Sequence, residues 1–332
     1  MTKTLAIRLI ARLLAAWTLL ALQPLHAADE PWPAARPIRM VVPSGAGSGT
    51  DIFARSFGAR LAQALQQTII YDNKAGANGI IGNDAGAKAA PDGYTLLFSN
   101  ASAMALNPVI QPRLPYQTLK DLVPVVQIGS GGVLLVVSAD FPARDLEGFV
   151  RHVKAHPDKL AYGTWGVGST GHLSMEALKA KAGLGMNHVP YKTMGQIFTD
   201  MQGGMLSIAF VDAVSSLPLI KAGKIIPIGI TGTRRTPRLP EVPTTQEQGY
   251  RLGADGWYGI FAPAGTAPAI VQRINAETNR LLADPQLRPA FEALNMAEPP
   301  IKTSAEFEKT LREDIETWRE IARNGRLVFD AQ

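Results

Sequence analysis

Hydrophobic and polar positions follow two alternating periods along the chain from residue 37 onward. Short runs rich in Val, Ile and Leu predict strands, and the stretches between them carry apolar residues three or four positions apart, which predicts helices. In the first part, this pattern places strands at 38–43, 68–72 and 94–99 and helices at 51–66 and 85–89. Such alternation of strands and helices is typical of an α/β protein whose sheets are mostly parallel.

A second series of strands and helices begins at residue 133. It predicts strands at 133–138, 160–163, 187–190, 206–210 and 225–231, with helices at 146–156, 172–182, 196–202 and 217–222. A strand at 256–263 and two amphipathic helices, 268–282 and 304–324, complete the pattern. We therefore expect one lobe from residues 36–132 and 254–332 and a second from residues 133–253. The two crossovers between these lobes suit a hinged clamp.

The first residues have the pattern of a secretory signal peptide. Lys3, Arg8 and Arg12 precede the apolar run Leu13–Leu22, which is shorter than the roughly 20 residues that span a bilayer. We predict that residues 1–27 are removed, or that cleavage falls one residue later, and hence that the protein is periplasmic. A retained anchor helix is the alternative interpretation.

Composition narrows the class of protein further. The formal charge of +5 comes largely from the signal segment, because removing its three basic residues leaves 30 of the 33 against 28 acidic residues, a net charge of +2. These charges are scattered and not clustered with aromatic residues, so we expect no nucleic-acid surface. The absence of cysteine excludes disulfides, thiolate metal sites and an N-terminal lipid anchor. We expect a soluble, monomeric mature protein.

The most informative motif is a glycine-rich turn between the first predicted strand and its helix. It comprises Ser44, Gly45, Ala46, Gly47, Ser48, Gly49, Thr50 and Asp51. Its glycines allow a ligand to approach the backbone, and either Thr50 or Asp51 is expected to cap the helix. The N–H groups of the first helical turn lack intrahelical partners, and their summed dipole favours an anion. A carboxylate is a natural ligand for this turn.

A second turn of the same kind follows the strand predicted at 160–163. Its candidate ligand-binding residues are Thr164, Gly166, Gly168, Ser169, Thr170 and His172. One such turn on each lobe would hold an anion between two helix N-termini through backbone donors, each charge-assisted bond contributing about 1.5–3 kcal/mol. Such a site needs no formal positive charge.

The second turn also matches part of a dinucleotide-binding motif. Gly166, Gly168 and Gly171 spell G-x-G-x-x-G between a strand and a helix. The acidic residue that holds a ribose is missing about twenty residues further on, at 188–192, so we do not predict a nicotinamide cofactor. The chain also lacks a P-loop, and His152 and His156 lack the glutamate of a zinc protease motif. We expect neither a cofactor nor a metal.

A hydrolase is the enzymatic alternative. Ser169 and His172 are close in sequence, and Asp212 would complete a triad. The chain lacks the G-x-S-x-G elbow of an α/β hydrolase, and a serine three residues before a histidine at a helix start more often caps and packs than reacts. A binding protein without catalytic residues is therefore favoured over an exported α/β hydrolase.

Further candidates lie at the ends of predicted strands, where ligands of open α/β sheets collect. They are Asn78, Ser99, Ser102, Tyr191 and Asp212. Asn78 is equally suited to a left-handed turn, and Tyr191 to a core position with a satisfied hydroxyl. Asp212 would repel a carboxylate but accept from an ammonium group or a water. Trp257 and Tyr258 are expected to pack between the lobes.

These motifs together resemble the Bug/TctC extracytoplasmic solute receptors of tripartite tricarboxylate transporters. The likeness covers nearly the whole mature chain. It rests on the Val-Val-Pro…Gly-x-Gly-Thr-Asp start and on the Ala-Pro-Asp-Gly-Tyr, Tyr-Gly-Thr…His, His-Val-Pro-Tyr-Lys and Trp-Tyr-Gly…Ala-Pro-Ala-Gly-Thr motifs, at 41–55, 90–97, 162–172, 188–192 and 257–266.

The resemblance implies a type II periplasmic-binding-protein (Venus-flytrap) fold that closes on a small organic carboxylate: a dicarboxylate, a tricarboxylate, an acidic amino acid or an aromatic acid. It implies that both glycine-rich turns bind the ligand and that Asp212 orients its far end. The implied partners are the membrane permease subunits of a tripartite tricarboxylate transporter. A ligand-sensing adaptor for a sensor kinase would share the same site and differ only in its partner.

Three positions depart from the family pattern. Ser44 stands where the family usually has an aromatic residue, Thr193 replaces a usual glycine, and Trp165 adds a large ring to the second turn. We expect Ser44 to remove a hydrophobic wall and to admit a bulkier or more polar ligand.

Overall fold

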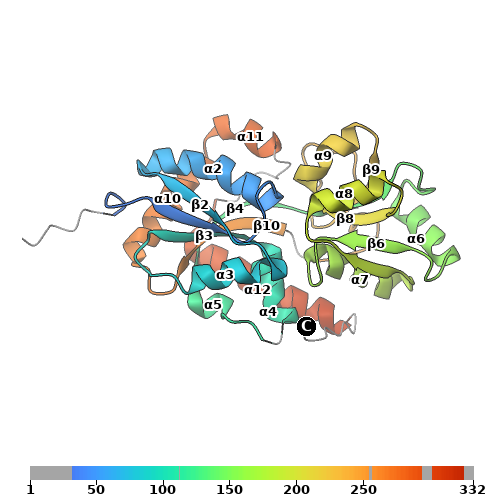
Figure 1. Cartoon of the computed structure of the whole chain (residues 1–332), viewed down its shortest axis with the longest axis horizontal. Helices are drawn as coiled ribbons and strands as arrows, with labels where there is room; N and C mark the ends of the chain where they lie inside the picture. The colour runs from blue at the N-terminus through green and yellow to red at the C-terminus, as the bar shows by residue number, and fades with distance from the viewer. Residues whose placement is uncertain (1–31, 112, 254–255, 294–300, 325–332) are drawn as a thin grey trace, which may run out of the picture.

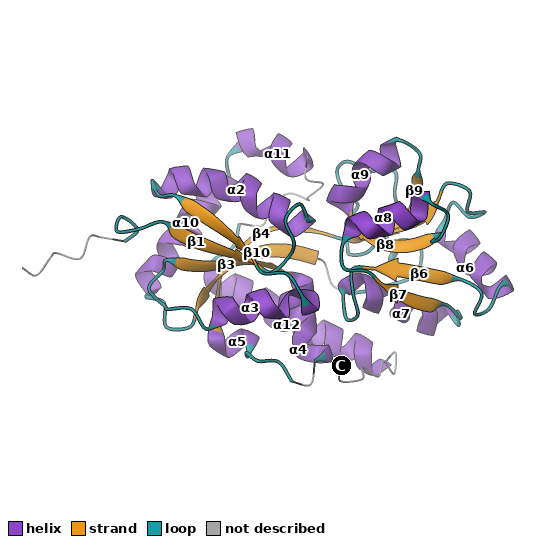
Figure 2. Cartoon of the chain, in the orientation of Figure 1, coloured by secondary structure: helices purple, strands orange, loops and turns teal. Residues whose placement is uncertain are grey.

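A computed structural model describes residues 32–111, 113–253, 256–293 and 301–324. It has two five-stranded sheets that lie side by side, each with helices on both faces (Figures 1 and 2). The predicted signal segment, residues 1–27, lies outside the described residues.

The first sheet has the strand order β2-β1-β3-β10-β4. Its strands are β1 (Ile38–Val42), β2 (Ile69–Asn73), β3 (Thr95–Asn100), β4 (Leu122–Gly131) and β10 (Gly256–Pro263). Strand β1 pairs in parallel with β2 and β3, whereas β10 runs antiparallel to β3 and β4.

The second sheet has the order β7-β6-β8-β5-β9. Its strands are β5 (Val133–Ser138), β6 (Ala161–Thr164), β7 (Asn187–Pro190), β8 (Ile208–Asp212) and β9 (Ile225–Ile230). Strand β6 is parallel to β7 and β8, and β5 is antiparallel to β8 and β9.

Each described sheet is therefore mixed, but four of its five strands run in the same direction, in agreement with the mostly parallel sheets predicted from the sequence; β10 and β5 are the antiparallel strands. The reason is the passage of the chain between the lobes. Strands that carry the glycine turns end at the junction between the two sheets, whereas β5 and β10 arrive from the other sheet and begin there. A strand that begins at the junction must run opposite to one that ends there.

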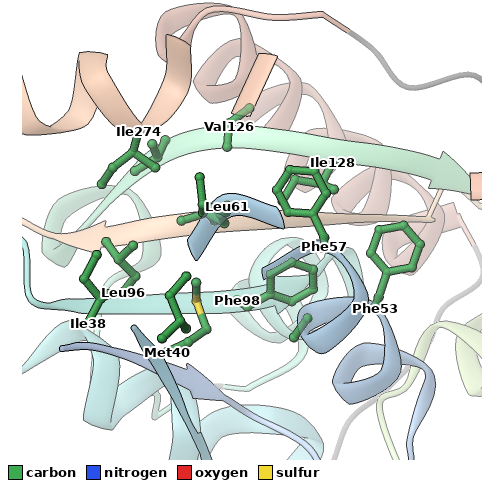
Figure 3. Packing of buried hydrophobic residues seen from close by; sticks show 14 of the residues in the cluster. Ile38, Met40, Phe53, Phe57, Leu61, Leu96, Phe98, Val126, Ile128 and Ile274 are labelled. Atoms are coloured by element: carbon green, nitrogen blue, oxygen red, sulfur yellow. The ribbon is translucent and has the colours of Figure 1, made fainter. Parts of the chain in front are cut away.

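The faces of the first sheet are buried by different helices. Side chains alternate along a strand, so Met40 points toward α2 (Gly49–Leu65) and α10 (Pro268–Leu282), while Val41 points toward the opposite face (Figure 3). That opposite face is covered by α12 (Ser304–Asn324) with the segment at 102–110. Burial on both sides explains the nearly continuous hydrophobic runs of these strands.

The second sheet is built in the same way. Leu135 and its alternate neighbours pack against α6 (Leu146–Ala155) and α7 (Thr170–Ala182). Leu134 and its alternate neighbours pack against α8 (Met194–Gln202) and α9 (Ala213–Lys221), on the other face. The helix bounds agree with the sequence pattern at most ends to within two or three residues; α9 begins four residues before its predicted start.

The sequence pattern missed several elements. It left β4 unassigned, and the cause is Pro124, which is tolerated because β4 lies at the edge of its sheet. It placed α3 (Ile80–Ala87) five residues too late, because Gly82 and Gly86 lower the helical signal. These glycines are needed for packing, since a Cβ at Gly82 would lie 2.5 Å from Cα of Pro43. The other short elements are η1 (Ala77–Gly79), η2 (Ser102–Leu106), α4 (Asn107–Ile110), α5 (Thr118–Asp121), η3 (Pro285–Leu287) and α11 (Arg288–Ala293).

The two sheets are linked at three places. Strand β4 continues into β5 through Gly132, and the chain returns from the second sheet to β10. Helix α12 is the third link, because its Trp318 is buried in one cluster with Leu173 of α7 and contacts Gly253. The junction between the sheets is therefore a packed region with defined contacts.

Candidate functional site

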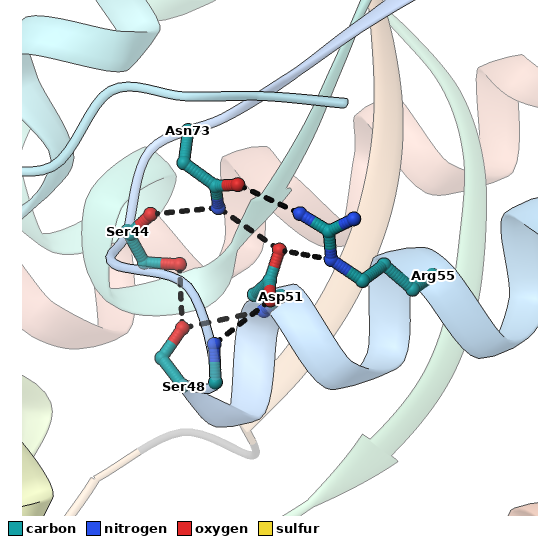
Figure 4. Close-up of polar contacts among 6 residues, drawn as sticks. Ser44, Ser48, Asp51, Arg55 and Asn73 are labelled. Atoms are coloured by element: carbon teal, nitrogen blue, oxygen red, sulfur yellow. Dashed lines mark hydrogen bonds and ion pairs between the residues drawn. The ribbon is translucent and has the colours of Figure 1, made fainter. Parts of the chain in front are cut away.

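The first glycine turn begins where β1 ends and leads into α2 (Figure 4). Ser48 is the N-cap of α2, with φ −72° and ψ 161°, and its hydroxyl accepts a hydrogen bond from the Asp51 N–H at 3.3 Å. The Gly47 N–H donates to Oδ2 of Asp51 at 2.8 Å. The prediction that Thr50 or Asp51 caps the helix is wrong, because the helix begins two residues earlier than predicted.

Asp51 is the buried centre of this turn. Its Oδ1 accepts from Nε of Arg55 and from Nδ2 of Asn73, each at 2.9 Å. Burial disfavours the charged carboxylate, but hydrogen bonds from Arg55, Gly47 and Asn73 outweigh burial and hold the pKa of Asp51 below its ordinary value. The Asp51 carboxylate therefore supports the turn through three hydrogen bonds.

The second glycine turn repeats this geometry between β6 and α7. Ser169 is the N-cap, with φ −72° and ψ 160°, and its hydroxyl accepts from the His172 N–H at 3.2 Å. The Gly168 N–H donates to Nδ1 of His172 at 3.1 Å. Gly168 and Gly47 have nearly equal φ values of 74° and 77°, which favour glycine. The two turns therefore have the same geometry. In each, the glycine N–H donates to a side chain four residues later, which is a carboxylate in the first turn and an imidazole in the second.

A chain of buried polar groups holds the second turn. Ser169 Oγ donates to Thr164 Oγ1 at 3.3 Å, and Thr164 Oγ1 donates to the Gly166 carbonyl at 3.1 Å. The only hydroxyl proton of Thr164 is used in that bond. Nε2 of His188 therefore acts as the donor in its 2.7 Å contact with Thr164 Oγ1. Thr164 and Ser169 are fully buried, so they shape the turn from inside.

The hydrogen bonds of Ser169 and His172 do not form a hydrolytic triad. The Ser169 hydroxyl donates to Thr164, and Nδ1 of His172 accepts from the Gly168 N–H. Asp212, the third predicted member, caps α9 instead. These hydrogen bonds instead stabilise the backbone turn between β6 and α7.

Residues from the first lobe contact the second turn directly. Asn78 Nδ2 donates to the Gly168 carbonyl at 3.0 Å, and the Thr170 N–H donates to Ser102 Oγ at 3.3 Å. Asn107 joins them, because Asn78 Nδ2 also donates to its Oδ1 at 2.9 Å. Three of the sequence-predicted residues, Asn78, Ser102 and Thr170, thus lie together at the junction of the two lobes.

Asp212 of the second lobe lies against the first turn. Its Oδ1 accepts from the Val214 and Ser215 N–H groups at 3.0 and 2.7 Å, so it is the N-cap of α9. A Cβ placed on Gly49 would lie 3.3 Å from the same oxygen and 3.1 Å from the hydroxyl of Tyr258. Contacts at Gly49 and Gly168 bring both glycine turns to the same junction.

Tyr258 is a junction residue that sequence reasoning assigned only to packing. Its ring stacks on Phe53 with centroids 4.9 Å apart, and its hydroxyl hydrogen bonds with Thr50. Burial, together with the nearby Asp212 carboxylate, raises the pKa of Tyr258, so the phenol stays protonated. Asn100, which donates to Thr50 at 3.1 Å, lies between the predicted site residues Ser99 and Ser102 at the end of β3.

Two predicted site residues bond within their own lobes. Ser99 is fully buried and donates to Oδ1 of Asn83 at 3.0 Å. The hydroxyl of Tyr191 donates to Asp200 at 2.7 Å, and burial with this bond raises the pKa of Tyr191 to about 12. The backbone N–H of Tyr191 donates to the Thr164 carbonyl of the second turn at 2.8 Å, so Tyr191 lies beside that turn through its main chain.

The three departures from the family pattern have local partners. Ser44 Oγ lies 2.7 Å from Ser48 Oγ, so its hydroxyl is part of the first turn. Thr193 caps α8 by accepting from the Gln196 N–H at 3.3 Å. Trp165 packs over the start of α7, where a Cβ on Gly171 would lie 2.8 Å from its ring.

Backbone donors at the two turns fall into two groups. The N–H groups of Gly47, Gly168 and Thr170 already have acceptors in Asp51, His172 and Ser102. Those of Gly49, Thr50 and Gly171 have no acceptor among the described residues. These three amides lie in the first turns of α2 and α7, where the helix dipole favours an anion.

Within the described residues, no group of three or more His, Asp or Glu side chains could hold a metal ion. No described helix combines the length and apolar character needed to cross a membrane.

Two α/β lobes, linked by crossovers and with one glycine turn each at their junction, define the two-lobed periplasmic-binding-protein fold.

Comparison with known proteins identifies the family. The chain matches the tripartite tricarboxylate transporter family receptor (TctC) over residues 53–327. It is 35% identical to Protein BugT of Bordetella pertussis over 291 residues, which cover 87% of this chain and 89% of BugT. The chain therefore belongs to the TctC family of periplasmic solute-binding receptors.

Solved structures agree with this assignment. A periplasmic transporter is 34% identical, with a TM-score of 0.84, over 90% of this chain and 100% of its own. An R. palustris protein solved with adipate is 28% identical, with a TM-score of 0.84, over 89% and 98%. MatC of Rhodopseudomonas palustris, solved with bound malate, is 30% identical, with a TM-score of 0.80, over 87% and 99%.

Proposed function

We propose that this protein captures a small organic carboxylate between its two lobes and delivers it to the permease subunits of a tripartite tricarboxylate transporter. The amides of Gly49, Thr50 and Gly171 carry this proposal, because three donors without acceptors lie at the N-termini of two helices that meet at one junction. An anion is the ligand that such donors favour. Adipate and malate, found with two structural relatives, are ligands of this chemical class.

The charges around the turns fit an anion held by the backbone. Neither turn contains lysine or arginine. The carboxylates that are present are already engaged, since Asp51 bonds Arg55 and Asn73, and Asp212 accepts from two amides and the Ser215 hydroxyl. Engaged carboxylates repel a bound anion less than free ones, because their charge is partly neutralised by the donors.

The residues at the junction have three roles in this proposal. Gly49, Thr50 and Gly171 donate to the ligand, with the exposed residues Gly45 and Ala46 of the first turn beside it. Ser48, Asp51, Thr164 and Ser169 hold the turns in place, and Asn78 with Ser102 ties the lobes together.

The proposed function also implies where the protein acts and how its lobes move. The chain is exported with cleavage of residues 1–27 and acts in the periplasm as a monomer. Residues 36–132 with 254–332 form one lobe and residues 133–253 the other, and the lobes close by rotation about the two crossovers.

Isothermal titration calorimetry of refolded protein tests the ligand class. The panel is adipate, malate, citrate, glutamate, benzoate and nicotinate, with uncharged adipamide as a control for chain length. At least one acid is expected to bind and adipamide is not. Absence of heat for every acid would contradict the proposal.

A pair of glycine variants tests the site. Gly49→Ala adds a methyl group beside the free amides, 3.1 Å from the Tyr258 hydroxyl, and is expected to weaken binding at least about tenfold, or ~1.4 kcal/mol. Gly195→Ala is the matched control, because Gly195 lies in the first turn of α8, where a Cβ would meet only Thr193 Oγ1, at an ordinary 3.9 Å. Equal affinities for the two variants would place the ligand elsewhere.

A further inference from the structure

The two glycine turns share their geometry but differ in the chemistry of one acceptor. In the first turn, the Gly47 N–H donates to the Asp51 carboxylate, which Arg55 and Asn73 keep ionised. In the second turn, the equivalent Gly168 N–H donates to the Nδ1 of His172. An imidazole nitrogen accepts a hydrogen bond only when it carries no proton. The bond from the Gly168 N–H to Nδ1 of His172 therefore forms only when His172 is neutral.

A second histidine disfavours the protonation of both rings at once. The rings of His172 and His188 stack with centroids 4.0 Å apart and an interplanar angle of 18°. Two protonated rings at this separation would repel each other. The ring of Tyr162 stacks with His188 at 5.0 Å and with His172 at 6.5 Å, so the three rings pack together in one group.

The charged and titratable groups around the pair come from β6, α7 and β7. Tyr162 on β6 donates to Glu176 on α7 at 2.5 Å, and Lys179 on α7 donates to the same carboxylate oxygen at 2.7 Å. Burial lowers the pKa of His172. The negative charge of Glu176 opposes this shift, and the positive charge of Lys179 adds to it. Burial, and then the neighbouring His172 and Lys179, lower the pKa of His188 to about 3.

We propose that His172 is a positioning residue for the second ligand-binding turn and that protonation of the stacked His172–His188 pair releases this turn, so that affinity for the carboxylate falls in acid. Protonated His172 would present an N–H to the Gly168 N–H, which removes the bond at 3.1 Å. The Gly168 carbonyl accepts from Asn78 of the other lobe, so a shift of Gly168 also weakens the contact between lobes. The first turn is not affected in the same range, because the pKa of Asp51 is held low.

The consequence for binding rests on the proposed function, whereas the positioning role does not. The two are separated by a measurement that needs no ligand. In ¹H–¹⁵N NMR spectra of uniformly labelled protein, the Gly168 amide resonance is expected to shift with pH in step with the Cε1 proton of His172. The Gly47 amide, bonded to Asp51, is expected to stay constant over the same range. A Gly168 amide that does not follow His172 would overturn the positioning role, whether or not any acid binds.

The variant His172→Asn supplies the decisive comparison. Its Oδ1 can accept from Gly168 as Nδ1 does, but it does not titrate. For the strongest acid of the panel, the wild-type affinity is expected to fall more than that of His172→Asn as pH decreases from about 7.5, by up to about tenfold for each pH unit below the lowered pKa of His172. Protonation of the acid itself is common to both proteins and cancels in the ratio. His156→Asn, at the C-cap of α6, is the matched control and is expected to behave as wild type.

Equal pH dependence in wild type and His172→Asn would overturn the proposed release. If no acid binds at neutral pH, the proposed function fails and the NMR titration alone decides the role of His172. If His172→Asn does not fold, His172→Gln and the wild-type NMR titration provide the same decision.

Discussion

Asn78 donates a hydrogen bond from Nδ2 to the carbonyl oxygen of Gly168 across the junction of the two lobes, at 3.0 Å. The same amide nitrogen donates to Asn107, and Oδ1 of Asn78 accepts from the hydroxyl of Ser102. Asn78 has φ 48° and ψ 42°, a left-handed conformation that asparagine tolerates better than most residues. Asn78 thus combines a left-handed backbone with a side-chain amide that bonds Gly168 of the other lobe.

Replacing Asn78 with glycine is predicted to weaken ligand binding about five- to thirtyfold, the loss of ~1–2 kcal/mol for the hydrogen bonds that favour the closed form. Glycine accepts the left-handed backbone, so the effect reports the lost amide and not strain. Calorimetry with the strongest acid of the panel measures the change. Gln66→Gly is the control, because Gln66 also has a positive φ of 52° but caps the far end of α2. Asn78→Gly with unchanged affinity would contradict a role in closure.

Replacing Asp51 with asparagine is predicted to lower the free energy of unfolding by about 1–3 kcal/mol. Three donors converge on the carboxylate from Gly47, Arg55 and Asn73, and an asparagine would present an N–H to one of them. Urea denaturation at neutral pH measures the loss. Asp145→Asn is the control, since Asp145 caps α6 with one bond to Gly148, which asparagine also makes.

The same carboxylate predicts a pH dependence. Because the pKa of Asp51 is lower in the folded than in the unfolded protein, its contribution to stability is present above the ordinary value of 3.8 and is lost as pH falls through the folded pKa. Wild-type and Asp51→Asn stabilities are therefore expected to converge below about pH 3.8. A difference that stayed constant in that range would show that the charge is irrelevant.

The strands and long helices were predictable because burial on both faces leaves an unbroken signal. Strands β5 and β10 have their predicted bounds, and so do α10 and α12. The direction of β5 and β10 within the sheets was not predictable, because it depends on where the chain passes between the lobes. Pro124 in β4 obscured a strand that only an edge position permits.

The two glycine turns were predictable from local sequence, but the hydrogen-bonding roles of their side chains were not. A glycine turn between strand and helix indicated both loops. The use of Asp51 and His172 as acceptors for Gly47 and Gly168 depends on partners such as Asn73 and His188, which are distant in sequence. No local pattern contains those partners.

Replacing Gly132 with alanine is predicted to lower the free energy of unfolding by about 1–3 kcal/mol, the usual cost of overpacking. A Cβ at this position would overlap the carbonyl oxygen of Thr231, so the backbone must shift where β4 passes into β5. Urea denaturation measures the change. Gly45→Ala is the control, because no atom lies within 4 Å of a Cβ placed there. Equal stabilities would show that the crossover accommodates a side chain.

Replacing His188 with glutamine is predicted to flatten the loss of stability in acid. The pKa of His188 is about 3 in the folded protein against an ordinary 6.5, so between these values the unfolded chain binds a proton that the folded protein does not. Stability therefore falls as pH decreases from about 6.5, with a slope of at most ~1.4 kcal/mol per pH unit for this residue, and it gains nothing above 6.5. Glutamine keeps an N–H donor for Thr164 without titrating.

Urea midpoints of wild type and His188→Gln at about pH 7, 6 and 5 test this, with His156→Gln as the remote control. The wild type and the control are expected to lose stability in parallel as pH falls from 6.5, and His188→Gln to lose less. Parallel loss in all three would mean that His188 does not stay neutral in the folded protein. The hydrogen bond from Nε2 to Thr164 at 2.7 Å would then have to hold a charged ring, and His172, 4.0 Å away, would be the neutral member of the pair.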